Sequence, residues 1–185
     1  NLQREVHNAC VSVQRNVAVT EEMLLSDPPD AVVIATGAVP YHPPGQFEDA
    51  HVVTAWEVLE NRANVGNSVV VADWRCDWVG LGIAEKLALE GCSVRLYVNG
   101  DTAGQMLHSF LRHQWVGRLH KLGVDIVPYM RLFGADADTV YMQHVMSEEA
   151  VLCREVDTLV LAYGHESVID LYAELDGKVE ALYAI

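Results

Sequence analysis

The stretch "VVVADWRCDWVGLGIAEKLALEGCSVRLYVNG", residues 69–100, divides into parts by the spacing of its apolar residues. Val69–Ala72 is an unbroken apolar run, which is typical of a strand buried on both faces in a parallel sheet. From Asp77 or Trp78 the apolar residues recur every four positions, which indicates an amphipathic helix. A turn at Gly91 then leads into a second apolar strand. The stretch therefore predicts a strand, a turn, a helix and a strand in the order of a Rossmann-type fold.

The turn between the first strand and the helix departs from the glycine pattern that binds dinucleotides. In a functional turn the first glycine makes the bend, the second admits the pyrophosphate, and the third packs the helix on the strand. Here Gly80 stands in the third position, but Arg75 and Asp77 stand in the first two. A carboxylate at position 77 satisfies the helix N-terminus itself and repels phosphate. The next strand also ends near Val98 without the acid that would hold the ribose hydroxyls. We therefore expect a degenerate turn without ordinary NAD(P)H binding. The alternative is an unusual mode in which Arg75 contacts a phosphate.

A second pattern occurs twice along the chain. "DAVVIATG" (30–37) and "DTLVLAYG" (157–164) share an acid, a small residue, three apolar residues, an alanine, a variable position and a glycine. Both predict a buried strand, and two strands of one design suggest two related lobes. Together with the alternation of strands and helices, this predicts an α/β architecture of the doubly wound type with a parallel sheet. We assign 1–62 and 167–185 to one split lobe and 63–166 to the other.

Further elements follow from local signals. We expect a strand at 11–19, helices capped by Thr20 and Thr54, and irregular chain at "AVPYHPPG". A long helix is expected over 104–123, stopped by Gly123. Short segments between 124 and 156 predict a small antiparallel element.

Composition excludes several classes of function. The chain has 185 residues, is 51% hydrophobic, and carries a formal charge of −14 with only 12 Lys and Arg. Such a charge argues against nucleic acid and anionic membrane surfaces as partners. No apolar run reaches the roughly 18 residues of a membrane helix. The four cysteines form no C-x-x-C pair, which favours reduced thiols in a cytoplasmic protein. His108, His113 and His120 lack the spacing of a metal pair, so we expect no metal site.

These motifs occur together in a known family. "DAVVIATGAVP", the altered turn followed by "IAEKLA" (83–88), "DTLVLAYG" and the exit "YGHESVIDLYAEL" (163–175) resemble one region of the NADH:flavin oxidoreductases. The resemblance is to the C-terminal, nucleotide-binding-type region of the branch related to trimethylamine dehydrogenase and 2,4-dienoyl-CoA reductase, which is related to old yellow enzyme. That region is similar to the FAD and NAD domains of the glutathione-reductase type. The trimethylamine dehydrogenase branch is the more similar, because it too lacks the first two glycines.

The resemblance implies cofactors and partners for a parent enzyme. Members have a barrel with FMN, a 4Fe–4S cluster held by cysteines, and ADP or FAD in the first lobe. Ala35, Thr36 and Gly37 match the segment beside that ADP or flavin, although these residues fit a tight crossover equally well. The chain begins at Asn1 and stops at "ALYAI", so we expect an excised middle piece that packs with the remainder of the flavoenzyme. No catalytic residue is carried over.

Three functions remain open at this stage. The first is a domain of an FMN and iron–sulfur amine dehydrogenase or demethylase-like oxidoreductase that passes electrons to an electron-transfer flavoprotein. The second is an NAD(P)H-dependent flavin oxidoreductase of the dienoyl-CoA reductase type. The third is a non-enzymatic interaction domain that uses the acidic surface and Trp74 and Trp78, which flank the turn and otherwise cover apolar surface. Only the second requires measurable affinity for NAD(P)H.

Overall fold

The computed structural model describes residues 2–185 and divides into two compact units. The first unit comprises residues up to Ala38 together with Ser167–Ile185, and the second comprises Val39–Glu166. The segment 39–62, which we assigned to the first lobe, is thus grouped with the second unit. It contributes a strand to the main sheet of that unit.

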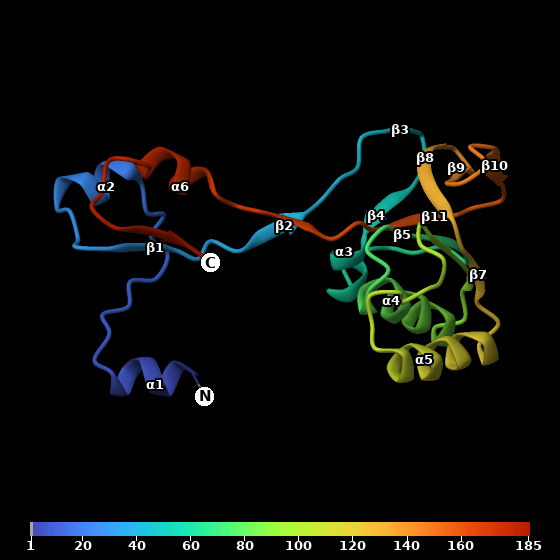
Figure 1. The fold of residues 1–185 in the computed structure, drawn as a ribbon, viewed down its shortest axis with the longest axis horizontal. Helices are drawn as coiled ribbons and strands as arrows, with labels where there is room; N and C mark the ends of the chain where they lie inside the picture. Colours follow the sequence, from blue (N-terminus) through green and yellow to red (C-terminus); the bar gives the residue numbers. More distant parts are fainter. Residues whose placement is uncertain (1) are drawn as a thin grey trace. The chain divides into compact units, whose positions relative to one another are not determined.

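A five-stranded parallel sheet forms the centre of the second unit (Figure 1). Its order is β4 (Val52–Thr54), β11 (Thr158–Ala162), β5 (Ser68–Asp73), β6 (Ser93–Val98) and β7 (Asp125–Val127). All four neighbouring pairs are parallel. The strand order 4-11-5-6-7 requires crossovers on both sides of β5, which is the signature of a Rossmann-type α/β fold. The predicted fold class is confirmed.

The two faces of the sheet are covered by different layers. Val69 and Val71 of β5 pack against α3 (Ala55–Leu59), α4 (Trp78–Leu89) and the buried side of α5 (Ser109–Lys121). Val70 and Ala72 point to the opposite face, because side chains alternate along a strand. There they meet an antiparallel sheet, whose strands are β8 (Met130–Asp136), β9 (Thr139–His144) and β10 (Ala150–Cys153). β3 (Gln46–Glu48) adds to the edge of β8. Figure 1 shows α4 and α5 on the side of the sheet away from these strands.

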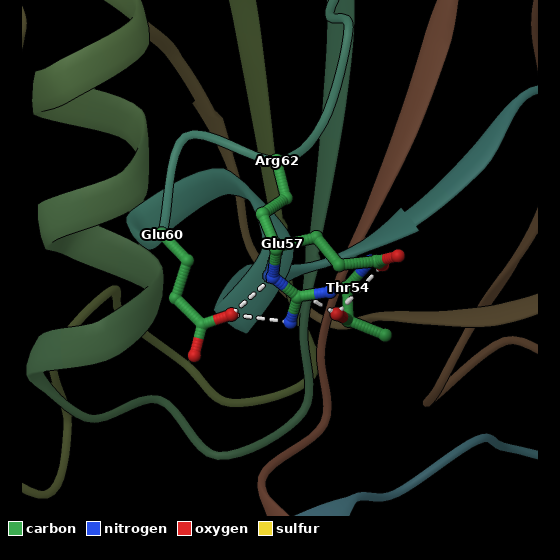
Figure 2. Close-up of polar contacts among 4 residues, drawn as sticks. All are labelled: Thr54, Glu57, Glu60 and Arg62. Carbon is green, nitrogen blue, oxygen red and sulfur yellow. Dashed lines mark hydrogen bonds and ion pairs between the residues drawn. The ribbon is translucent and has the colours of Figure 1, made fainter.

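Side-chain caps fix where two of the helices begin. Figure 2 shows the capping box of α3, in which Thr54 and Glu57 bond each other's backbone N–H groups at 3.3 and 2.7 Å. The N–H and the hydroxyl of Thr54 both donate to the Glu57 carboxylate, and these two hydrogen bonds lower the pKa of Glu57. Arg62 pairs with Glu60 beside this cap. Thr20 caps the short helix α2 (Glu21–Ser26) through its own side chain.

The first unit is small and has its own core. β1 (Val32–Ile34) pairs in parallel with β13 (Leu182–Ala184), and α6 (Asp170–Leu175) packs on them through Leu175. Helix α1 (Leu2–Asn8) has no buried residue. β2 (Ala38–Pro40) and β12 (His165–Ser167) pair where the chain passes from one unit to the other.

Several expected elements differ in the structure. Residues 11–19 form no strand, because no neighbouring segment pairs with them and their side chains are all exposed. The run 30–37 yields only β1, which has one paired edge, and Val33 is 58% exposed instead of buried on both faces. "AVPYHPPG" contains β2 and is not wholly irregular. The long helix begins at Ser109, because residues 101–107 form turns. Among the helices within residues 2–185, none has the length and hydropathy that a membrane crossing requires.

Candidate functional site

A cleft of about 440 Å³ lies in the second unit at the carboxyl ends of β4, β5 and β11. This is the edge of an open parallel sheet where ligands bind in α/β proteins. Residues from α3, the turn after β5, the start of α4, the loop before α5 and the end of β11 line it. They are Ala55, Trp56, Arg75, Asp77, Trp78, Val79, Met106, Leu107, Gly164 and His165. The cleft therefore occupies the place that a nucleotide takes in this fold.

The turn between β5 and α4 places two of its own side chains, Arg75 and Asp77, in this cleft. Asp77 is the N-cap of α4, and its Oδ1 accepts a hydrogen bond from the N–H of Val79 at 2.8 Å. Nε of Arg75 lies 3.7 Å from Oδ2 of Asp77. The stem of Arg75 runs over Gly164, where a Cβ would lie 3.1 Å from Cδ of Arg75. Gly164 also has φ of +83°, so glycine is required there both by backbone conformation and by the arginine.

Gly80 lies against a buried carboxyl group. Asp73, the last residue of β5, is 2% exposed, and its Oδ1 accepts from the N–H of Cys76 at 2.8 Å. Its Oδ2 has no hydrogen-bond partner in the described part of the chain. A Cβ on Gly80 would lie 2.2 Å from this Oδ2. Burial raises the pKa of Asp73 to about 7, and the charge of Asp77 adds to the effect. Gly80 thus allows α4 to pack closely on β5, with a carboxyl group at the contact.

The end of β6 carries no acid. Asn99 follows Val98, and its Oδ1 accepts from the thiol of Cys76 at 3.1 Å. Cys76 is buried with φ of +51°, and burial raises the pKa of its thiol. The amide of Asn99 is therefore engaged in holding the turn, and the thiol is kept neutral and unreactive.

Aromatic side chains surround the remaining cleft. The ring of Trp56 lies 6.4 Å from that of His165. Trp78 is 65% exposed and lines the same space. Trp74 instead stacks on Tyr163, with centroids 5.8 Å apart. The two tryptophans that flank the turn thus differ, because one covers Tyr163 and the other faces the cleft.

The residues matched to the ADP or flavin segment lie in the first unit. Thr36 donates its hydroxyl to the carbonyl of Val168, and the N–H of Val168 donates to the carbonyl of Gly37 at 3.0 Å. Thr36 and Gly37 also border a hollow of about 190 Å³, whereas Ala35 is exposed without lining it. These residues hold the returning chain at this point in the structure.

Three residues at or beside the site cannot be singled out from the motifs of the sequence. Trp56 and His165 come from separate elements and both line the cleft, and Asp73 lies against Gly80. An acid directly after a buried strand was the available signal for Asp73. Within residues 2–185, no group of three His, Cys, Asp or Glu side chains is arranged to hold a metal ion. All four cysteines are free thiols.

No family model matches the chain. A probable N-methylproline demethylase of Rhizobium meliloti is 26% identical over 168 residues, which are 89% of this chain and 25% of that protein. A metal reductase of Desulforamulus reducens is 29% identical over 96% of this chain and 32% of its own length. The chain therefore spans about a quarter to a third of the relatives it matches.

A solved structure shares the fold of the chain. Histamine dehydrogenase from Rhizobium sp. 4-9 superposes with a TM-score of 0.81 at 20% identity, over 98% of this chain and 32% of that one. This likeness shows a shared fold. Together with the motifs of the sequence, the two relatives above show that the chain is similar to a region of the NADH:flavin oxidoreductases related to trimethylamine dehydrogenase and 2,4-dienoyl-CoA reductase.

Proposed function

We propose that the chain is a nucleotide-binding-type domain of an amine dehydrogenase or demethylase-like oxidoreductase, in which the NAD(P)H site has been lost. Relatives named as a demethylase and a dehydrogenase of N-methylated substrates support the class of reaction. In this proposal, the small unit, residues up to Ala38 with Ser167–Ile185, is part of a split FAD or ADP-type lobe, and Val39–Glu166 form the degenerate NAD-type lobe.

The observation that carries the proposal is the occupied turn between β5 and α4. Asp77 already satisfies the N–H of Val79, one of the donors at the helix N-terminus. A phosphate about 4 Å from a carboxylate meets a repulsion of about 4 kcal/mol at an effective dielectric constant of ~20. That energy corresponds to a loss of about a thousandfold in affinity. The stem of Arg75 lies on Gly164, between the ends of two adjacent strands.

The proposal assigns the redox cofactors to the parent enzyme. FMN and a 4Fe–4S cluster would perform the oxidation and the single-electron transfers, with ADP or FAD in the first lobe. The described cysteines are separate from one another and form no cluster site in this part of the chain. The domain would act as a scaffold packed against the barrel, and an electron-transfer flavoprotein would replace NAD⁺ as acceptor.

Calorimetric titration of the 185-residue chain with NADH and NADPH tests the proposal. We expect no heat of binding up to millimolar ligand, and a micromolar Kd would overturn the proposal. The matched variant is R75G/D77G, which restores the glycine positions and costs only a few tenths of a kcal/mol at the N-cap. We expect it to gain measurable NADH affinity. If R75G/D77G also fails to bind NADH, the absence of binding has another cause, such as the missing acid after Val98, and the residues of the turn do not explain it.

A second candidate is an NAD(P)H-dependent reductase. The metal reductase relative favours it, as does the complete parallel sheet at the expected edge. Hydride transfer requires that the nicotinamide binds, so this candidate predicts micromolar NADH or NADPH affinity in the same titration.

A further inference from the structure

The cleft beside the turn retains an arginine whose hydrogen-bonding capacity is not used. Within residues 2–185, the guanidinium of Arg75 forms no side-chain hydrogen bond, and its ion pair with Asp77 is 3.7 Å long. A charge-assisted hydrogen bond of this kind is normally about 2.7–2.9 Å, so the contact with Asp77 is loose. The Arg75 side chain is 54% exposed and lines the cleft. A planar guanidinium in this state is able to bind a carboxylate through two parallel N–H groups.

The walls of the cleft favour a flat apolar body next to that anion. Trp56 and Trp78 come from two different helices, and His165 packs near Trp56. Met106 and Leu107 add apolar surface from the loop before α5. Aromatic rings stack on such surfaces and gain about 0.5–1.5 kcal/mol beyond the area they bury. The volume of about 440 Å³ lies within the range of small-molecule sites.

The electrostatics decide the sign and the amount of charge on the ligand. Arg75 favours an anion over a cation, and at the N-terminus of the twelve-residue helix α4 Asp77 bonds only the N–H of Val79 among the first N–H groups. Asp77, however, is close enough to penalise a second negative charge. A single carboxylate satisfies both conditions, whereas a phosphate dianion or a pyrophosphate does not.

We propose that this cleft binds an aromatic monocarboxylate, with the carboxylate on Arg75 and the ring against Trp56 and Trp78. The proposal rests on the proposed function, since it requires that the turn is closed to dinucleotides. It assigns to the degenerate site a ligand of different chemistry from the one that the fold ordinarily takes.

Titration calorimetry of the full chain with benzoate tests this assignment. We expect saturable binding of benzoate, and at least about tenfold weaker binding of neutral benzamide and of phenyl phosphate. R75A should weaken benzoate about tenfold or more, as expected for loss of a hydrogen bond to a charged group. D77N keeps a good N-cap residue and removes the competing charge, so it should strengthen benzoate several-fold. The control R118A, on an arginine of similar exposure in α5, should leave the affinity unchanged.

Three results would overturn the inference. These are no benzoate binding, benzoate binding that R75A does not change, and phenyl phosphate binding as well as benzoate. Each result is independent of the NADH titration. NADH binding would refute the proposed function, whereas silence towards both NADH and benzoate would refute only the inference. Tryptophan fluorescence of W78L, compared with that of W74L, separates ring stacking in the cleft from stacking on Tyr163.

Discussion

Asp73 should make the stability of the second unit depend on pH in a direction opposite to that of most carboxylates. Burial raises its pKa from an ordinary value of 3.8 to about 7. Burial is the main cause, and the charge of Asp77 adds to it. Three contributions lower the pKa of Asp73 without cancelling the effect of burial. They are the backbone hydrogen bonds from Cys76 and Arg75 and the charge of Arg75. The folded state therefore holds a proton that the unfolded chain releases near its ordinary pKa.

The sign and size follow from linkage. A group whose folded pKa is raised contributes stability that is complete below pH 3.8 and is lost as pH rises through about 7. Each pKa unit corresponds to about 1.36 kcal/mol, so the full window is about 4 kcal/mol. Between about pH 5 and pH 8, Asp73 alone should lower the free energy of unfolding by about 3 kcal/mol.

Urea unfolding of wild type and D73N at several pH values measures this effect. All four tryptophans lie in the second unit, at positions 56, 74, 78 and 115, so fluorescence reports on its unfolding. The substituted asparagine buries an amide where Oδ2 of the aspartate has no partner, which costs about 1–3 kcal/mol at about pH 5. We expect D73N to be the less stable variant at that pH and to approach or pass wild type at about pH 8. Parallel stability profiles for the two proteins would refute the reasoning.

Three further predictions concern the same unit and use the same unfolding assay. G80A should lose about 3 kcal/mol or more, because its Cβ would meet the Asp73 carboxyl at 2.2 Å; G82A, which meets only Trp115 at 3.7 Å, is the control. G164A should lower the free energy of unfolding by about 1–3 kcal/mol, because alanine is strained at the positive φ of this position. In the double variant R75A/G164A, only the part of this loss that is due to contact with the arginine should be recovered. T54A should lose about 1–2 kcal/mol through the capping box of α3, whereas T139A, whose hydroxyl bonds only the exposed Asp138, should stay within about 0.5 kcal/mol.

The parts of the fold that could be predicted are those whose signals are local. Val69–Ala72 and 158–162 are apolar almost without interruption, and both lie in central strands. The helix after the turn begins at Trp78, where the period changes and Asp77 offers a cap. Residues 11–19 and 30–37 show the limit of this approach. Alternating or apolar residues permit a strand, but a neighbouring strand must supply the hydrogen bonds, and the sequence does not reveal whether one is present.

The candidate site was predictable only where its residues are contiguous. The substitutions at Arg75 and Asp77 can be identified by counting back from Gly80, because the glycine pattern is itself a sequence pattern. Trp56 and His165 enter the cleft from elements that lie far apart in the chain, and the sequence does not indicate that they meet. The contact between Gly80 and Asp73 was hidden for a similar reason. Nothing in their spacing along the chain shows that a carboxyl group lies under a helix.

The three glycine positions of the turn differ in what constrains them, and this difference bears on the proposed loss of the nucleotide. In a dinucleotide site the first glycine makes the bend and the second lets the pyrophosphate approach the backbone. Where no phosphate binds, other residues are tolerated at these two positions. The third position touches the protein itself. In this chain it touches the buried carboxyl of Asp73, which leaves no space for a Cβ whether or not a nucleotide is present. Side chains at positions 75 and 77 are therefore compatible with an intact parallel sheet, whereas a side chain at position 80 is not. By the same reasoning, a retained third glycine is evidence for the fold alone, and the first two positions are the ones that report on nucleotide binding.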